Sequence, residues 1–276
     1  MSFFQRLAAA SGRNRSYLCI GLDPDPARLP VPDVLTFNRA VIEATADLAC
    51  CYKPNAAFFE ALGPQGWEVL VRTVEAVPDG IPVVLDAKRG DIGSTAAAYA
   101  RAAFDVLGAD AVTASPYLGE DALAPFLEWE DRGVYVLCRT SNPGARDVQD
   151  LRAVREDGTT VPLYLAVAER ARGWNRAGNV GLVVGATYPE EMRAVRAACP
   201  ELPFLVPGVG AQGGDLAAAV GAALDAEGGG FVIAVSRQVL YAGSGREFAA
   251  AARAAARELR DAINRHREAA LAARRP

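Results

Sequence analysis

The stretch VVLDAKRGDIGSTAAAYA begins at Val83 with a short run of aliphatic residues, and two acids and a lysine follow this run within six positions. These three residues are Asp86, Lys88 and Asp91. Residues two positions apart on a strand point to the same face, so the carboxylate of Asp86 and the ammonium group of Lys88 can meet. A carboxylate beside an ammonium group can hold a proton in place for transfer to a bound molecule. The stretch is therefore the first candidate for a catalytic site.

Lysine is rare in this chain. Among 29 lysines and arginines, only Lys53 and Lys88 are lysines. An ammonium group can give up a proton, whereas the guanidinium group of arginine stays protonated in proteins. An ion pair with a purely structural role could use arginine, so the two lysines indicate a role in chemistry.

Composition excludes several classes of function. The net charge of −4 and the pI near 5.3 argue against binding to nucleic acid. The N-terminus lacks the order of regions of a secretory signal, and apolar runs of about 6–9 residues are too short to span a membrane. Five cysteines without a CxxC pair predict neither a disulfide framework nor a zinc site, which favours the cytoplasm. His266, the single histidine, lies in a charged terminal stretch, so mechanisms that need a catalytic or metal-bound histidine are excluded.

Apolar runs and helical patterns alternate along the chain. Continuous apolar runs are typical of strands buried on both faces, and eight such runs begin at Tyr17, Leu48, Ile81, Ala109, Gly133, Asn179, Leu202 and Gly230. The segments between them carry apolar residues at helical spacing, with start signals at Asp33, Thr36, Ser94 and Pro189 followed by Glu190. A repeat of about 30 residues is the length of one βα unit.

The alternation predicts an α/β protein with the (β/α)8 architecture, a TIM barrel. We expect a single domain over residues 1–276, with a long irregular βα loop at about 141–160 and a C-terminal helix. A doubly wound open sheet is disfavoured because no GxGxxG follows the first run. Two separate α/β domains are disfavoured because the chain has no linker between them.

The carboxyl ends of the predicted strands collect polar residues, and active sites of such barrels lie there. These ends hold Asp23, Lys53, Asn55, Asp86, Lys88, Arg139, Thr140, Ser141, Asn142, Ser236 and Arg237. Both lysines of the chain are among them. Because Lys53 follows the strand next to that of Asp86, we expect an array of alternating charge formed by Lys53, Asp86, Lys88 and Asp91.

A phosphate site is predicted near the last two strands. The stretch VPGVGAQGGD, residues 206–215, is a glycine-rich turn before a helix, and Gln212 offers a side-chain donor. Ser236 and Arg237 follow the next strand. Backbone N–H groups at a helix start and a guanidinium group together form an anion site.

The chain resembles the orotidine 5′-monophosphate decarboxylase family, in its bacterial subgroup with the LDAKRGDI motif. The resemblance rests on GLDPDP, YKPN, LDAKRGDIGSTAAAYA, TSNPG, VVGAT, PGVGAQGGD and SRQVLYA, which occur in this order. It implies a carboxy-lyase that converts orotidine 5′-monophosphate (OMP) to uridine 5′-monophosphate (UMP), the last step of de novo pyrimidine nucleotide synthesis. It also implies a homodimer without metal or organic cofactor, while the composition described above predicts a cytoplasmic protein that binds neither nucleic acid nor membrane.

The resemblance further implies a role for individual residues. Lys88 would protonate C6 of the pyrimidine, and Asp86, held by Lys53, would lie against the substrate carboxylate. Asp91 and Thr95 would reach into the site of the partner subunit. The remaining contacts to substrate would come from Asp23 at the ribose, Ser141 at the base, and Gln212, Ser236 and Arg237 at the 5′-phosphate.

Three alternatives stay open at this point. A metal-dependent sugar-phosphate decarboxylase or aldol-type synthase of the same wider group would use acids such as Glu60 and Asp86 as metal ligands. A Schiff-base aldolase would use Lys88 as its nucleophile. A non-catalytic sensor would bind the nucleotide phosphate without turnover.

Overall fold

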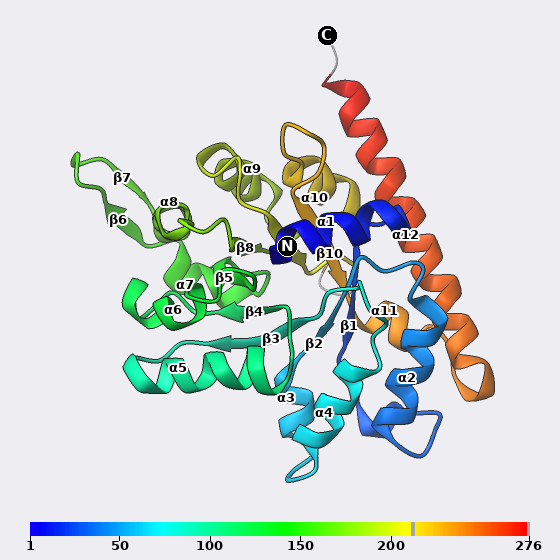
Figure 1. Ribbon diagram of the computed structural model, residues 1–276. Helices are drawn as coiled ribbons and strands as arrows, with labels where there is room; N and C mark the ends of the chain where they lie inside the picture. Colours follow the sequence, from blue (N-terminus) through cyan, green and yellow to red (C-terminus); the bar gives the residue numbers. More distant parts are fainter. Residues whose placement is uncertain (211–212, 275–276) are drawn as a thin grey trace.

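Eight parallel strands form a barrel in the computed structural model, which describes residues 1–210 and 213–274 (Figure 1). The strands are β1 (Leu18–Leu22), β2 (Cys51–Pro54), β3 (Val84–Arg89), β4 (Ala111–Ala114), β5 (Gly133–Arg139), β8 (Val180–Val184), β9 (Phe204–Pro207) and β10 (Phe231–Val235). Their order in the sheet is β2-β1-β10-β9-β8-β5-β4-β3. Bridges from Tyr52 to Val83 and from Asn55 to Asp86 join β2 to β3. The predicted (β/α)8 barrel is thereby confirmed, and each of the eight apolar runs contains one of these strands.

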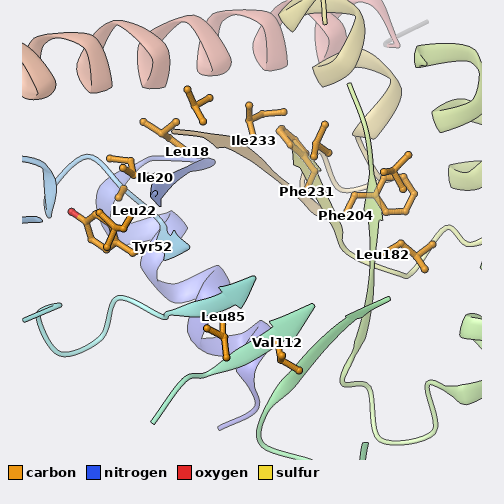
Figure 2. Packing of buried hydrophobic residues seen from close by; sticks show 14 of the residues in the cluster. Leu18, Ile20, Leu22, Tyr52, Leu85, Val112, Leu182, Phe204, Phe231 and Ile233 are labelled. Atoms are coloured by element: carbon orange, nitrogen blue, oxygen red, sulfur yellow. The ribbon is translucent and has the colours of Figure 1, made fainter. Parts of the chain in front are cut away.

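Helices surround the barrel. They are α2 (Val34–Thr45), α3 (Ala56–Glu60), α4 (Gly66–Glu75), α5 (Gly93–Arg101) with a π-helical turn (Ala102–Val106), α6 (Glu120–Leu127), α8 (Leu163–Trp174), α9 (Pro189–Ala198), α10 (Leu216–Ala223), α11 (Arg237–Leu240) and α12 (Phe248–Ala273). Figure 2 shows strand residues such as Leu18, Ile20 and Ile233 in the apolar layer between the sheet and these helices. Within the described chain, no helix is both long and apolar enough to cross a membrane.

Of the predicted start residues, Asp33 and Pro189 are correct, whereas Thr36 and Ser94 lie inside their helices. Asp33 precedes α2, and its Oδ1 accepts a hydrogen bond from the Thr36 N–H at 2.8 Å. Pro189 is the first residue of α9. Ser94, in contrast, lies inside α5, because the chain enters this helix through Gly93 at φ +52°, a conformation that glycine adopts readily.

The N-terminal helix α1 (Phe3–Asn14) has no counterpart in the eight predicted units. Phe3 is fully buried and packs edge-on against Tyr135 of β5, with 5.9 Å between ring centroids. Both residues belong to a second apolar cluster with Leu7, Cys19 and Cys51. The cysteines of this cluster are free and buried, so they act as small apolar side chains, as the sequence indicates.

The segment after β5 is more regular than the loop predicted at about 141–160. It contains a 3-10 turn (Pro143–Ala145), the short helix α7 (Arg146–Gln149) and a hairpin of β6 (Arg152–Val154) with β7 (Thr160–Pro162). The hairpin extends away from the barrel (Figure 1). Its turn is closed by Asp157, whose carboxylate accepts from the Thr159 N–H at 2.9 Å, and by Gly158 at φ +81°.

The C-terminal helix, predicted from its pattern, belongs to the wall around the barrel. Leu259 and Ile263 are buried, and the Arg267 side chain donates to the carbonyl of Gly228 before β10. The helix therefore stays packed well beyond residue 260.

Candidate active site

One carboxylate links the two lysines at the carboxyl ends of β2 and β3. Lys53 Nζ lies 2.9 Å from Asp86 Oδ2, and Lys88 Nζ lies 2.6 Å from Asp86 Oδ1. The two lysines therefore meet at one point, as the sequence predicts. Charged hydrogen bonds of this kind fix both partners more firmly than neutral ones do.

The three side chains differ in exposure. Those of Lys53 and Asp86 are 8% and 12% exposed, whereas that of Lys88 is 48% exposed. Burial lowers the pKa of Lys53, but the charges of Asp86 and Asp23 outweigh burial and hold this pKa above its ordinary value. Burial raises the pKa of Asp86, but the charges of the two lysines outweigh it and hold this pKa well below its ordinary value. At neutral pH the Lys53–Asp86 pair is therefore charged, and the Lys88 ammonium group reaches open space.

A bulge at the end of β3 brings Asp86 and Lys88 together. On the β4 side, Leu85 pairs with Val112 and Arg89 with Ala114, so residues 86–88 lie opposite Thr113 alone in that strand. Lys88 has a φ of +48°, in the left-handed region that residues other than glycine seldom adopt. The predicted contact is present, but the expected regular alternation along this strand is wrong, because the bulge interrupts it.

Asp91 is not part of this array within the chain. Its Oδ1 accepts a hydrogen bond from the Ile92 N–H at 2.8 Å. Among the described residues, no ion pair within 4.0 Å joins Asp91 to a lysine. Thr95, in the first turn of α5, is exposed, as is Ile92. Both predicted residues therefore follow the end of β3, Asp91 partly buried and Thr95 exposed.

A cavity of about 500 Å³ lies next to the array, between the ends of β1, β2, β9 and β10. Asp23, Lys53, Ser236 and Arg237 line it, as the sequence predicts. Asp23 Oδ1 and Ser236 Oγ are buried and have no hydrogen-bond partner in the described structure, although buried polar atoms normally have one. These two atoms are free to bind a ligand. Gln212, the other predicted phosphate ligand, lies outside the described residues.

Two residues that the sequence did not single out also line the cavity. The Arg28 guanidinium group lies 3.8 Å from the ring centroid of Tyr241. The Tyr241 hydroxyl accepts from the Asp25 N–H at 2.6 Å and donates to the carbonyl of Asp23 at 3.3 Å. Tyr241 therefore links the chain after β1 to the chain after α11 and positions Asp23.

Ser141 lies between the end of β5 and the chain after β8. Its carbonyl accepts from Thr187 Oγ1 at 3.2 Å. A side chain at Gly185 would place its Cβ 2.8 Å from the Ser141 nitrogen, so only glycine permits this close approach. The VVGAT motif therefore supports Ser141 by packing, and Ser141 does not line the 500 Å³ cavity.

Arg139 anchors the segment that follows Ser141. Its side chain is fully buried, 3.1 Å from the Asp150 carboxylate, and lies 4.0 Å above the Tyr188 ring centroid. Asp150 follows α7, and Tyr188 precedes α9. One buried guanidinium group thus ties the segment after β5 to the segment after β8.

The carboxylates near the array bind cationic side chains of this chain and are therefore poorly placed to hold a divalent cation. The Glu60 carboxylate lies 2.6 Å from Arg89 Nη2, and the Asp86 carboxylate is held by two lysines. Over residues 1–210 and 213–274, no group of three or more His, Cys, Asp or Glu side chains has the spacing of a metal site. Both carboxylates that the metal-dependent alternative would use are thus paired with cationic side chains of this chain.

Fold and site together define a class of protein. A (β/α)8 barrel with a Lys-Asp-Lys array at its strand ends and a polar cavity beside it is a barrel enzyme for an anionic substrate. Residues 16–253 match the model of the orotidine 5′-phosphate decarboxylase / HUMPS family. The chain belongs to this family.

Individual relatives are similar to this chain over nearly its whole length. The chain is 59% identical to the orotidine 5′-phosphate decarboxylase of Roseiflexus castenholzii, covering 96% of this chain and 98% of the relative. It is 57% identical to that of Thermomicrobium roseum, with 97% of each chain covered. The solved structure of Leishmania donovani OMP decarboxylase superposes with a TM-score of 0.86 at 49% identity, over 97% of this chain and 100% of that one.

Proposed function

We propose that this protein decarboxylates OMP to UMP and that Lys88 supplies the proton that replaces the carboxyl group. High identity to curated decarboxylases over nearly the whole chain supports the reaction. The observation that supports the role of Lys88 is the Asp86 carboxylate between two ammonium groups, one buried and one half-exposed.

The reaction breaks the bond between C6 and the carboxyl carbon. Carbon dioxide leaves, and the electron pair stays on C6, an sp2 carbon that delocalises it poorly. A preorganised positive charge beside C6 stabilises this carbanionic transition state. The Lys88 ammonium group then gives a proton to C6 and becomes an amine, which solvent reprotonates because the side chain is half-exposed.

Asp86 has two tasks in this proposal. It holds Lys88 at 2.6 Å and so orients the proton donor. Its carboxylate also lies against the carboxylate of bound OMP, whose negative charge disappears as carbon dioxide forms. Lys53, at 2.9 Å on the other side, keeps the Asp86 carboxylate in place and reaches the ribose.

The cavity beside the array takes the ribose and the 5′-phosphate. Asp23 Oδ1 accepts from the ribose hydroxyls, and the Ser236 hydroxyl and Arg237 guanidinium group bind the phosphate. Gln212, from the glycine-rich turn, completes the phosphate site, and Ser141 contacts the base.

Replacement of Arg237 by alanine tests the substrate assignment. We expect kcat/KM for OMP to fall by about 10- to 100-fold, since a hydrogen bond to a charged group contributes about 1.5–3 kcal/mol. Turnover of orotidine, which lacks the phosphate, should not change. Arg246→Ala, at an exposed arginine outside the cavity, serves as the control. An equal loss with OMP and orotidine would show that Arg237 does not act on the phosphate.

The active protein is a homodimer in this proposal. Asp91, Ile92 and Thr95 follow the end of β3, and Tyr117 and Leu118 follow the end of the neighbouring strand β4; Ile92, Tyr117 and Leu118 are 59%, 85% and 47% exposed. Large apolar side chains gathered at the strand ends are typical of an interface. Across it, Asp91 and Thr95 enter the site of the partner subunit.

Mixed dimers test this arrangement. Lys88→Ala and Asp91→Ala dimers are each expected to be inactive, and mixing them after reversible dissociation should restore about one quarter of wild-type activity. Half of the dimers are then hybrids, in which one site has Lys88 from one subunit and Asp91 from the other. If Asp91 acts within its own subunit, every hybrid site lacks one residue and no activity returns.

The proposal places the enzyme in the cytoplasm. Its five cysteines are free and buried, as expected for a protein that works in a reducing compartment.

A further inference from the structure

We propose that Thr113 of β4 is a positioning residue for the decarboxylation. Its hydroxyl group holds the bulged end of β3 in the conformation that brings the Lys88 ammonium group to Asp86. The inference rests on the proposed function and adds a residue from a different strand to the site.

The Thr113 hydroxyl makes three hydrogen bonds, all to the bulge. Oγ1 accepts from the Ala87 N–H at 3.1 Å and from the Lys88 N–H at 2.9 Å. It donates to Asp86 Oδ1 at 2.9 Å. A hydroxyl group has one hydrogen to donate and two lone pairs that accept, so its whole capacity is used. Thr113 is 1% exposed, so it is shielded from bulk water.

The bulge needs such a partner. A regular parallel ladder would pair N–H groups of β3 with carbonyls of β4, but Thr113 is the one residue of β4 opposite residues 86–88. Without the hydroxyl group, the Ala87 and Lys88 N–H groups would lose the acceptor that they share. The side chain of one strand thus replaces the missing backbone partners of the other.

The same contact holds the unusual backbone at Lys88. A φ of +48° is strained for a residue with a side chain, and it persists only where surrounding contacts enforce it. Thr113 binds the N–H group of Lys88 and the carboxylate that its ammonium group contacts. It therefore fixes both ends of the lysine relative to Asp86.

Thr113→Val tests the inference, because valine has nearly the same shape but no hydroxyl group. We expect kcat for OMP to fall by about 100-fold, since a small misplacement of a catalytic group has an effect of this size. The dissociation constant of UMP should stay within about threefold, because phosphate and ribose carry most of the binding. Thr113→Ser, which keeps the hydroxyl group, should recover most of kcat.

Thr73→Val is the matched control. Thr73, in α4 and outside the site, is also fully buried. Its hydroxyl group accepts a hydrogen bond from Asn38 Nδ2 at 3.3 Å. We expect this variant to keep wild-type kcat although it too loses a buried hydrogen bond. If Thr113→Val does not fold, the kcat of Thr113→Ala is compared with that of Thr113→Ser, since these two variants also differ in the hydroxyl group.

The outcomes separate this inference from the proposed function. If the wild-type protein turns over OMP and Thr113→Val has the same kcat, the positioning role of Thr113 is overturned, but the proposed function is not. A crystal structure of Thr113→Val with Lys88 still at positive φ and paired with Asp86 would do the same. A wild-type protein without OMP turnover would overturn both the proposed function and this role.

Discussion

Replacing Lys88 with alanine is expected to lower kcat for OMP by about four orders of magnitude or more, because proton donation and charge stabilisation are lost together. The dissociation constant of UMP should change by only a few-fold, since the cavity that takes ribose and phosphate is lined by other residues. Rapid-mixing assays at high enzyme concentration measure the residual rate, and titration with UMP measures binding.

Lys88→Arg separates the two roles of the ammonium group. Arginine keeps a positive charge near Asp86 but cannot release a proton under these conditions. We expect its kcat to stay within about tenfold of Lys88→Ala, since a guanidinium group cannot replace the proton donor. Near wild-type turnover by Lys88→Arg would contradict proton donation by this residue.

Asp86→Asn is expected to lower both activity and stability. The amide keeps the shape of the carboxylate but removes the charge that holds Lys88 at 2.6 Å and Lys53 at 2.9 Å, so kcat should fall by about 1000-fold. The free energy of unfolding should fall by about 3 kcal/mol, because the Lys53 ammonium group is left buried without its partner. Asp110→Asn is the control, since Asp110 is a partly buried ion-pair partner of Arg6 away from the array.

The stability difference between wild type and Asp86→Asn should depend on pH. In the folded protein the pKa of Asp86 is well below its ordinary value, so the carboxylate stabilises the fold fully above about pH 5. This contribution is lost as the pH falls from the ordinary pKa of an aspartate toward the lower pKa that Asp86 has in the folded protein. Urea unfolding at about pH 6 and at about pH 2.5 should therefore give a difference that shrinks with acid. A difference that stays constant would show that Asp86 is not stabilised by the lysines.

Local sequence patterns were sufficient to place the main catalytic candidates. Buried strands of a parallel barrel are continuous apolar runs, so a charged residue at the end of a run marks the end of a strand. Because all carboxyl ends meet at one rim, Lys53 and Asp86 could be expected to meet without knowledge of any contact. Their ion pair at 2.9 Å is the result.

The bulge of β3 could not be predicted in the same way. The sequence DAKR fits a regular strand in which side chains alternate between the two faces. No residue type in it indicates that Lys88 adopts a positive φ. The conformation depends on Thr113, which is 25 residues further along the chain. A polar residue inside the apolar run ADAVTASPY was the available signal, but a single threonine in a strand is common.

The segment after β5 was misjudged for a related reason. Its charges and glycines indicate a loop, but the buried Arg139 binds Asp150 and so folds the segment back onto the barrel. The contact joins residues from two elements, and the pattern of either one alone does not reveal it.

The most direct test of the account is OMP turnover by the EDTA-treated wild-type protein. The absorbance of OMP should fall in metal-free buffer, with one UMP and one carbon dioxide formed for each OMP consumed. Addition of magnesium should leave the rate unchanged. A protein that is inert toward OMP and becomes active only with magnesium and a sugar phosphate would contradict the account and support the metal-dependent enzyme instead.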